Sequence, residues 1–320
     1  MNPMLGICDE LSKCNSVEEI AQAIINQHSK YDNLKFTYRV RRNTDEAPKI
    51  IETREEYVVM SSNDTAYPDP WESWKVFKQN ESGQWEIQKF AVFDGKNTYS
   101  FERSPVNDNP KSFWVQGKIE TSYKYTHFFY NSFSQMVHGG FVGYTNRPTL
   151  ISKQIREQMD GLLKITGEAT FLGMPAIEMS RIEPTLKKRF DSSDLIENDF
   201  VGKILISKSP IVLVVHSDRI DYLSRKKIGE SCIEKVDVFE GIYYPAKYKN
   251  VFFADGLTKY NRIYECEVES IERLTETSRA TWVPQWPSGT IVFDQINNKN
   301  IEIPHTKEQI DKFRDNYFAQ

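Results

Sequence analysis

The side chains that could carry out acid–base or nucleophilic chemistry are scattered along the chain. Ser217 lies between His216 and Asp218, but these residue types occur together too often to predict a hydrolase. The sequence contains no Gly-x-Ser-x-Gly motif, no Walker loop and no His-Glu-x-x-His motif. The chain has five histidines, none at the spacing of metal ligands: His28, His127, His138, His216 and His305. We therefore predict a protein that is not an enzyme and holds no metal or cofactor.

Aromatic side chains that could hold an apolar ligand are concentrated between Trp71 and Tyr130. These sixty positions hold fifteen aromatic residues, including four of the six tryptophans. Apolar and polar residues mostly alternate there, which predicts strands with their large side chains on one broad face of a sheet. Such a face would gain about 25 cal/mol for each Å² of ligand surface removed from water, so an acyl chain could bind without specific hydrogen bonds. The predicted ligand-binding residues are Trp74, Phe77, Trp85, Phe90, Phe93, Tyr99, Phe101, Phe113, Trp114, Phe129 and Phe133.

The same aromatic residues have a simpler interpretation. Large aromatic side chains are common in protein cores, and they could pack against helices with no ligand present. The alternative function is then a protein-interaction or structural role, in which an edge strand such as 34–42 or 291–293 adds to a partner's sheet. The paired carboxylates Glu55-Glu56 and Asp191-Asp194 are expected to face water.

The elements that would position the aromatic residues can be predicted from their spacing. Ser16 and Glu19 have the spacing of a capping box, and the residues that follow predict a helix. From Leu34, apolar and polar residues alternate as in a strand. Ser82-Gly83 and Asp94-Gly95 predict hairpin turns, so consecutive strands should pair antiparallel.

The second part of the chain repeats this pattern. Helical spacing predicts helices over 123–137 and 150–159. Strands resume with 163–171 and 175–182, joined by a turn at Leu172-Gly173-Met174, and continue from 203 to Asp294, and a terminal helix follows over 306–318. The predicted fold class is α+β: a large, strongly curved antiparallel sheet, or incomplete barrel, with covering helices. With 39% hydrophobic and 27% charged residues, the chain can bury a core, and we expect one domain over 1–320 with a mobile insertion near 186–201.

Charge and cysteine content limit the partners and the compartment. The net charge is −4 and the basic residues are interspersed with acidic ones, so nucleic acid is not an expected partner. The first residues are too few and too charged for a membrane span or a secretory leader, so the chain is cytosolic or its leader has been removed. The cysteines, Cys8, Cys14, Cys232 and Cys266, could be two disulfides or free thiols, with Cys232–Cys266 slightly favoured as a pair.

Short patterns over most of the chain resemble those of LolA-like outer-membrane lipoprotein-sorting proteins. They lie at 17–41, 93–95, 165–169, 173–177, 236–245 and 286–294. The resemblance implies a curved, incomplete barrel with helices as a lid, whose hydrophobic concavity holds the acyl chains of lipoproteins or other lipids. It further implies a periplasmic or otherwise exported protein, with an acylated protein or an envelope protein as partner, and a cytoplasmic location is the alternative.

Overall fold

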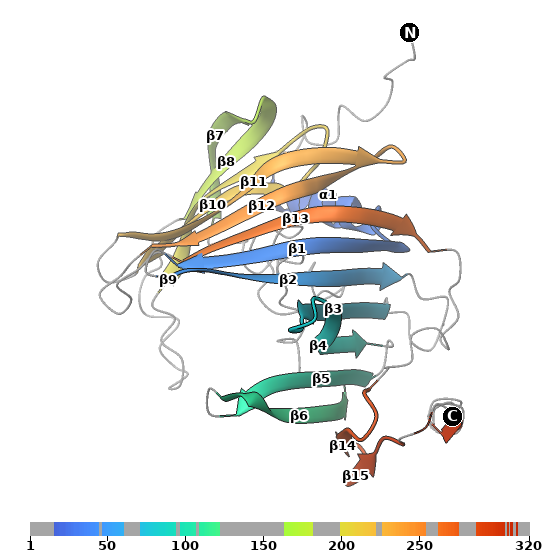
Figure 1. Ribbon diagram of the computed structural model, residues 1–320. Helices are drawn as coiled ribbons and strands as arrows, with labels where there is room; N and C mark the ends of the chain where they lie inside the picture. The colour runs from blue at the N-terminus through green and yellow to red at the C-terminus, as the bar shows by residue number, and fades with distance from the viewer. Residues whose placement is uncertain are drawn as a thin grey trace, which may run out of the picture.

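The computed structural model describes most of the strands predicted from the sequence. The described residues are 16–44, 47–60, 71–93, 97–106, 109–121, 163–181, 199–221, 226–253, 262–274 and 286–304, with positions 306, 308, 309 and 312 beyond them. All strands in these ranges belong to one sheet of fifteen strands (Figure 1).

The helix and the strands of the first part of the chain are α1 (Val17–Ser29), β1 (Leu34–Thr44), β2 (Ala47–Met60), β3 (Trp71–Gln79), β4 (Trp85–Phe93), β5 (Asn97–Val106) and β6 (Asn109–Thr121). The strands of the second part are β7 (Leu163–Phe171), β8 (Met174–Arg181), β9 (Asp199–Ser207), β10 (Val214–Asp221), β11 (Lys227–Phe239), β12 (Ile242–Phe252), β13 (Arg262–Arg273), β14 (Ile291–Asp294) and β15 (Lys299–Glu302).

The sheet consists of two antiparallel meanders joined side by side. Its strand order is β15-β14-β6-β5-β4-β3-β2-β1-β13-β12-β11-β10-β9-β8-β7. β1 pairs with β13, which brings the first strand of one meander against a late strand of the other. β14 pairs with β6 in parallel, and every other neighbouring pair is antiparallel. The predicted antiparallel sheet is confirmed, and over the described residues it is not closed, because β7 and β15 lie at its two ends.

The sheet order corrects the prediction of edge strands. β1 has a partner on each side, β2 and β13, and β14 lies between β6 and β15. Neither strand can therefore add to a partner's sheet, because the backbone groups on both of its sides already form ladder hydrogen bonds.

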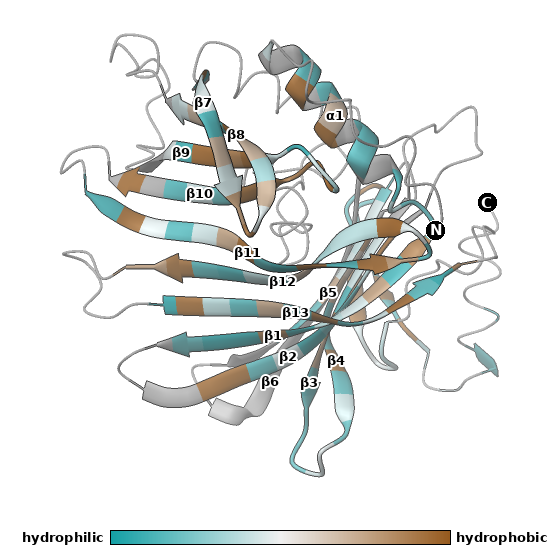
Figure 2. Ribbon diagram, turned by 90° about the horizontal axis from the view of Figure 1, so that it is seen from above, coloured by the Kyte–Doolittle hydropathy of each residue, from teal (hydrophilic) through white to brown (hydrophobic). Residues whose placement is uncertain are grey.

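The sheet bends around the side on which α1 lies. Seen from above, α1 crosses one side of the sheet, and β7 to β10 turn toward that same side (Figure 2). Of the predicted covering helices, α1 is the one that the described residues contain; 123–137 and 150–159 lie outside those residues, and so does most of 306–318. Of the predicted insertion, 186–198 also lie outside, and Asp199 to Val201 are the first residues of β9.

The start of α1 forms the predicted capping box. The backbone N–H of Glu19 donates to Ser16 Oγ at 3.2 Å, and the backbone N–H of Ser16 donates to Glu19 Oε2 at 3.2 Å. Ile20, Ile24 and Gln27 are buried on one face of the helix, at helical spacing. These contacts fix where the helix begins and which face it turns to the sheet.

Replacing Ser16 with alanine is expected to lower the free energy of unfolding by about 1 kcal/mol, because one of the first N–H groups of α1 loses its acceptor. Urea denaturation of both proteins would measure this. Ser16→Asp is the control, since aspartate also caps helices and should keep most of the stability. An equal loss in both variants would contradict the assigned cap.

Two hairpin turns, one between β7 and β8 and one between β11 and β12, contain glycine at a position with a positive φ angle. Leu172 and Gly173 have φ angles of 51° and 76°, and Glu240 and Gly241 have φ angles of 48° and 79°. Two consecutive positive φ angles are typical of a type I′ turn, whose twist matches that of the strands it joins. The predicted turn at Leu172-Gly173 is confirmed, and the second turn aligns β11 with β12.

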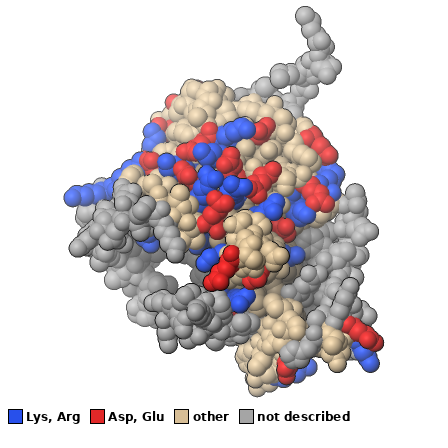
Figure 3. Space-filling view, in the orientation of Figure 1, with Lys and Arg blue, Asp and Glu red and all other residues tan. Residues whose placement is uncertain are grey.

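The two faces of the sheet differ in chemistry. In β1, Phe36, Tyr38 and Val40 are buried on the face where α1 lies, which we call the inner face. Lys35 and Arg41 point to the opposite, outer face, where they pair with glutamates of neighbouring strands. Lys, Arg, Asp and Glu are interspersed over the outer face of β11, β12, β13, β1 and β2, so neither sign of charge dominates there (Figure 3).

Candidate ligand-binding face

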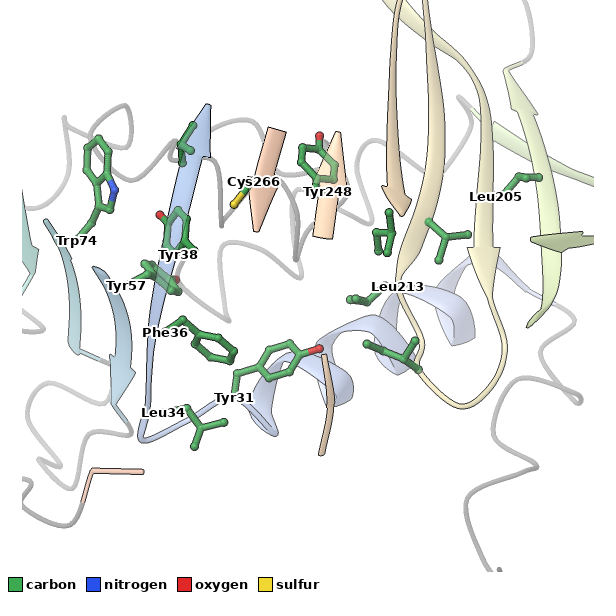
Figure 4. Packing of buried hydrophobic residues seen from close by; sticks show 14 of the residues in the cluster. Tyr31, Leu34, Phe36, Tyr38, Tyr57, Trp74, Leu205, Leu213, Tyr248 and Cys266 are labelled. Atoms are coloured by element: carbon green, nitrogen blue, oxygen red, sulfur yellow. The ribbon is translucent and has the colours of Figure 1, made fainter. Parts of the chain in front are cut away.

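The largest group of buried apolar side chains centres on the inner face. One continuous cluster runs from Trp74 in β3 to Met174 in β8 and includes Phe36, Tyr38 and Tyr248. Cross-strand register explains its continuity: Val40 and Tyr248 each pair with Cys266, so the three side chains form one row across β1, β13 and β12. In Figure 4, the rings of Phe36 and Tyr31 lie beside α1, and Cys266 and Tyr248 lie further along the neighbouring strands β13 and β12.

Tyr31, two residues beyond the end of α1, ties the helix to this cluster. The ring of Tyr31 meets that of Phe36 edge-on, with centroids 5.7 Å apart. Tyr31 Oη donates to the carbonyl of Tyr243 at 3.1 Å, and Gln27 Nε2 donates to the same carbonyl at 3.3 Å. A carbonyl at the start of β12 thus holds the end of the helix against the inner face.

A carboxylate is buried within the inner face. Glu55 in β2 has no exposed surface, and its Oε2 accepts hydrogen bonds from Tyr38 Oη at 3.0 Å and from Trp74 Nε1 at 2.9 Å. Thr53 Oγ1 donates to Oε1 at 3.3 Å. These three neutral donors partly replace the water that the carboxylate loses on burial.

Burial decides the direction of the Glu55 pKa. Loss of water raises the pKa of Glu55 above its usual 4.5, and the hydrogen bonds from Trp74 and Tyr38, together with the positive charge of Arg42, partly oppose that rise. The expectation that Glu55 and Glu56 both face water is therefore wrong for Glu55. Neighbouring residues in a strand point to opposite faces, so only one of the two could lie on the outer face.

The two described cysteines cannot form the disulfide that the sequence slightly favoured. Cys232 in β11 pairs with Lys249 of β12, whereas Cys266 in β13 pairs with Tyr248, the preceding residue of the same strand. The two thiols thus point to opposite faces, with β12 between their strands, and both are free. Burial raises the pKa of Cys266 well above its usual value and also raises that of Cys232, which disfavours the reactive thiolate. Cys8 and Cys14 lie outside the described residues.

A second aromatic cluster lies on the outer face of β4 and β5. Phe90 pairs with Phe101, and Val92 pairs with Tyr99, while Ala91 between them belongs to the inner-face cluster. Trp286, which precedes β14, packs on Phe90 at 6.1 Å between ring centroids, and its Nε1 donates to the carbonyl of Ser100 at 3.0 Å. The prediction of one broad aromatic face is therefore wrong, because the aromatic residues divide between two opposite faces.

The predicted ligand-binding residues are distributed accordingly. Trp74 lies on the inner face, and Phe90, Tyr99 and Phe101 lie under Trp286 on the outer face. Phe77 and Trp85 are half-buried. Phe93, Phe113 and Trp114 lie in strands whose backbone is described, but their side chains are outside the described part of the structure. Phe129 and Phe133 lie outside the described residues. Ligand binding by these residues stays a prediction.

Several inner-face residues were missed as candidates. Phe36, Tyr38 and Tyr57 contribute large rings from β1 and β2. The alternation from Leu34 to Val40 was visible in the sequence, but the pairing of β1 with β13, which places this strand at the middle of the sheet, was not. Glu55 carried no signal of burial, since charged residues are rarely buried.

His216 lies beside the apolar cluster: its ring centroid is 6.0 Å from that of Phe171, which packs against the cluster. His216 Nε2 and Asp218 Oδ1 are 3.0 Å apart, and Lys227 Nζ lies 2.7 Å from the same carboxylate oxygen. Ser217 is buried and pairs with Ser231, so its hydroxyl and the His216 ring leave the strand on opposite faces. The serine and histidine do not form a catalytic pair.

Comparisons with known proteins give matches among solved structures. No protein-family model matches the chain, and no curated protein matches it in sequence. An outer-membrane lipoprotein-sorting protein domain from Vibrio parahaemolyticus is 9% identical, with a TM-score of 0.47, over 83% of this chain and 95% of that one. A DUF1329 family protein from Desulfovibrio piger is 9% identical, with a TM-score of 0.44, over 83% and 95%. A LolA superfamily protein from Nitrosomonas europaea is 10% identical, with a TM-score of 0.41, over 82% and 97%.

The first and third of these structures bear the name of the family that the sequence resembles.

Across the described ranges, α1 included, no helix has the length and apolar composition needed to span a membrane.

Proposed function

We propose that this protein binds or carries a lipid, an acyl chain or the acyl moiety of a lipoprotein, without catalysing a reaction, in the cell envelope. The observation that supports this proposal is the apolar cluster of the inner face, which extends from Trp74 in β3 to Met174 in β8 on a sheet that bends around α1. A long apolar surface on the hollow side of a curved sheet suits a long apolar ligand.

Acyl chains fit the energetics of such a surface. Each CH₂ group removed from water contributes about 0.8 kcal/mol, so a chain needs length rather than specific polar contacts. The inner face offers mostly apolar side chains, and the polar atoms around Glu55 already have hydrogen-bond partners. The face is therefore better suited to a hydrocarbon than to a polar substrate.

Cys266 offers a direct test, because its small side chain lies at the middle of the inner face between Val40 and Tyr248. We expect the wild-type protein to take up a fluorescent fatty acid at a saturable site. Because Cys266 is only 1% exposed, Cys266→Trp should overpack this part of the inner face, weakening uptake about tenfold or more and lowering the free energy of unfolding by about 1 to 3 kcal/mol. Fluorescence titration and urea denaturation measure the two quantities.

Cys232→Trp is the matched control, since it adds the same side chain to the opposite face of the sheet and should leave uptake unchanged. If the inner face is instead filled by the protein's own side chains, Cys266→Trp should destabilise the fold by the same amount, and there would be no uptake for it to weaken. The wild type would then take up no probe. That result would favour a structural or protein-interaction role with a filled core.

A further inference from the structure

Two arginines and two aromatic rings form a continuous stack at one end of the inner face. The guanidinium carbon of Arg42 lies 5.7 Å from the ring centroid of Tyr264, and that of Arg262 lies 5.5 Å from the ring centroid of Phe252. The two rings meet edge-on at 5.9 Å. These contacts link neighbours in a zigzag rather than a line: Arg42 in β1 pairs with Tyr264 in β13, and Phe252 in β12 pairs with Arg262, which is again in β13.

Strand register places this stack on the same face as the apolar cluster. Val40 pairs with Cys266, and two residues further along both strands Arg42 pairs with Tyr264. Residues two apart in a strand point to the same side of the sheet, so Arg42 continues the row of inner-face residues in β1. Arg262 is the diagonal neighbour of Arg42, and such neighbours lie about 7 to 8 Å apart, with their Cβ atoms somewhat closer. Two arginine side chains at that spacing can reach one anion.

The two arginines differ from those of the outer face in forming no ion pair within the described ranges, although the charge of Arg42 acts at longer range on the buried Glu55 carboxylate. On the outer face, Arg41 Nε lies 3.0 Å from Glu52, and Arg273 Nε lies 2.7 Å from Glu240. Arg42 and Arg262 are exposed, and neither forms an ion pair with any residue in the described ranges. They are held over aromatic rings, which orients a guanidinium but leaves its N–H groups able to donate.

The surroundings of the stack are polar on one side and apolar on the other. Ser217 and Ser231 are buried, face each other across β10 and β11, and lie in the same row of the inner face as Tyr264. Ile51, which pairs with Arg42 across β1 and β2, is 47% exposed. An exposed aliphatic side chain beside an exposed guanidinium matches a ligand that is both apolar and anionic.

We propose that Arg42 and Arg262 together bind the anionic headgroup, a carboxylate or a phosphate, of a lipid whose acyl chain lies on the inner face. This inference rests on the proposed function and narrows its ligand class to acidic amphiphiles. Arginine favours carboxylate and phosphate because its planar N–H groups match two oxygens at once. The acyl chain would run from the stack toward Phe36 and Tyr31, along the apolar cluster.

The test compares a fluorescent fatty acid with its methyl ester, which has the same chain and no charge. In the full chain we expect the acid to bind about tenfold or more tightly than the ester, since the ester loses charge-assisted hydrogen bonds. Arg42→Gln/Arg262→Gln should remove that difference by weakening binding of the acid, with ester binding unchanged. Arg41→Gln/Arg273→Gln, which removes the same charge from the outer face, should keep the difference.

The outcomes separate the two proposals. If acid and ester bind the wild type equally, or if the outer-face variant weakens acid binding as much as the inner-face variant does, the headgroup site is contradicted and lipid binding stands. If neither probe binds, the proposed function itself fails. Competition with inorganic phosphate or acetate distinguishes a lipid headgroup from a free anion. Displacement of the fluorescent acid by either ion at concentrations comparable to that of the probe would mean that a free anion is the ligand, and would overturn the lipid assignment.

Discussion

Glu55→Leu is expected to lower the free energy of unfolding by about 3 kcal/mol. The substitution removes the acceptor of the Trp74 Nε1–H and Tyr38 Oη–H bonds, and both donors remain buried. A hydrocarbon of similar size does not compensate for donors that have lost their acceptor. Urea denaturation at neutral pH measures the loss, and a change within about 0.5 kcal/mol would contradict the assigned network.

Glu55→Gln is the matched control, because the amide oxygen can still accept from Trp74 and Tyr38 without carrying charge. Burial raises the pKa of Glu55 above 4.5, so between 4.5 and the raised value the folded protein holds a proton that the unfolded chain has lost. Stability from this group therefore falls as pH rises through that window. The stability of the wild type relative to Glu55→Gln should accordingly decrease from acidic to neutral pH, and a parallel pH profile would contradict the buried charge.

Trp286→Ala is the second substitution with a large expected effect. It should lower the free energy of unfolding by about 3 to 5 kcal/mol. Its indole is buried against Phe90 and Tyr99, with ring centroids 6.1 and 6.2 Å away, and its Nε1 donates to the carbonyl of Ser100. Alanine would leave a cavity and an unpaired carbonyl at once. The change in the urea midpoint reports the cost.

Trp85→Ala is the control for the loss of a tryptophan. Trp85 is the first residue of β4 and is only half-buried. Its replacement by alanine should therefore lower the free energy of unfolding by about 1 kcal/mol or less. Similar losses in both variants would mean that the segment before β14 does not anchor on β4 and β5. Retention of fatty-acid uptake in folded Trp286→Ala would show that the outer cluster is separate from ligand binding.

The sequence predicts local features of this fold well. Alternation in β1, the capping box at Ser16 and the turn at Leu172-Gly173 each depend on residues close together in the chain, and each is confirmed. Antiparallel pairing between consecutive strands follows from the same short-range signals.

What the sequence could not predict depends on distant pairing. Period-two alternation shows that Phe90 and Ala91 face opposite sides but not which side faces α1, and only the position of Trp286 decides that the larger ring belongs outside. Burial of Glu55 likewise depends on Trp74 and Tyr38 from two other strands. The stack of Arg42 and Arg262 requires the β1–β13 register, which no local pattern contains.

The junction of β1 with β13 also bears on how the chain reaches its native state. Arg39 and Glu269, which pair across this junction, are 230 residues apart in the chain. Forming such a contact costs the conformational entropy of closing a large loop before the strand pairing returns any free energy, so folding should be slow. During synthesis, β1 cannot pair with β13 until nearly the whole polypeptide has been made. Until then, Phe36 and Tyr38 would lie beside an open strand edge, a species prone to self-association.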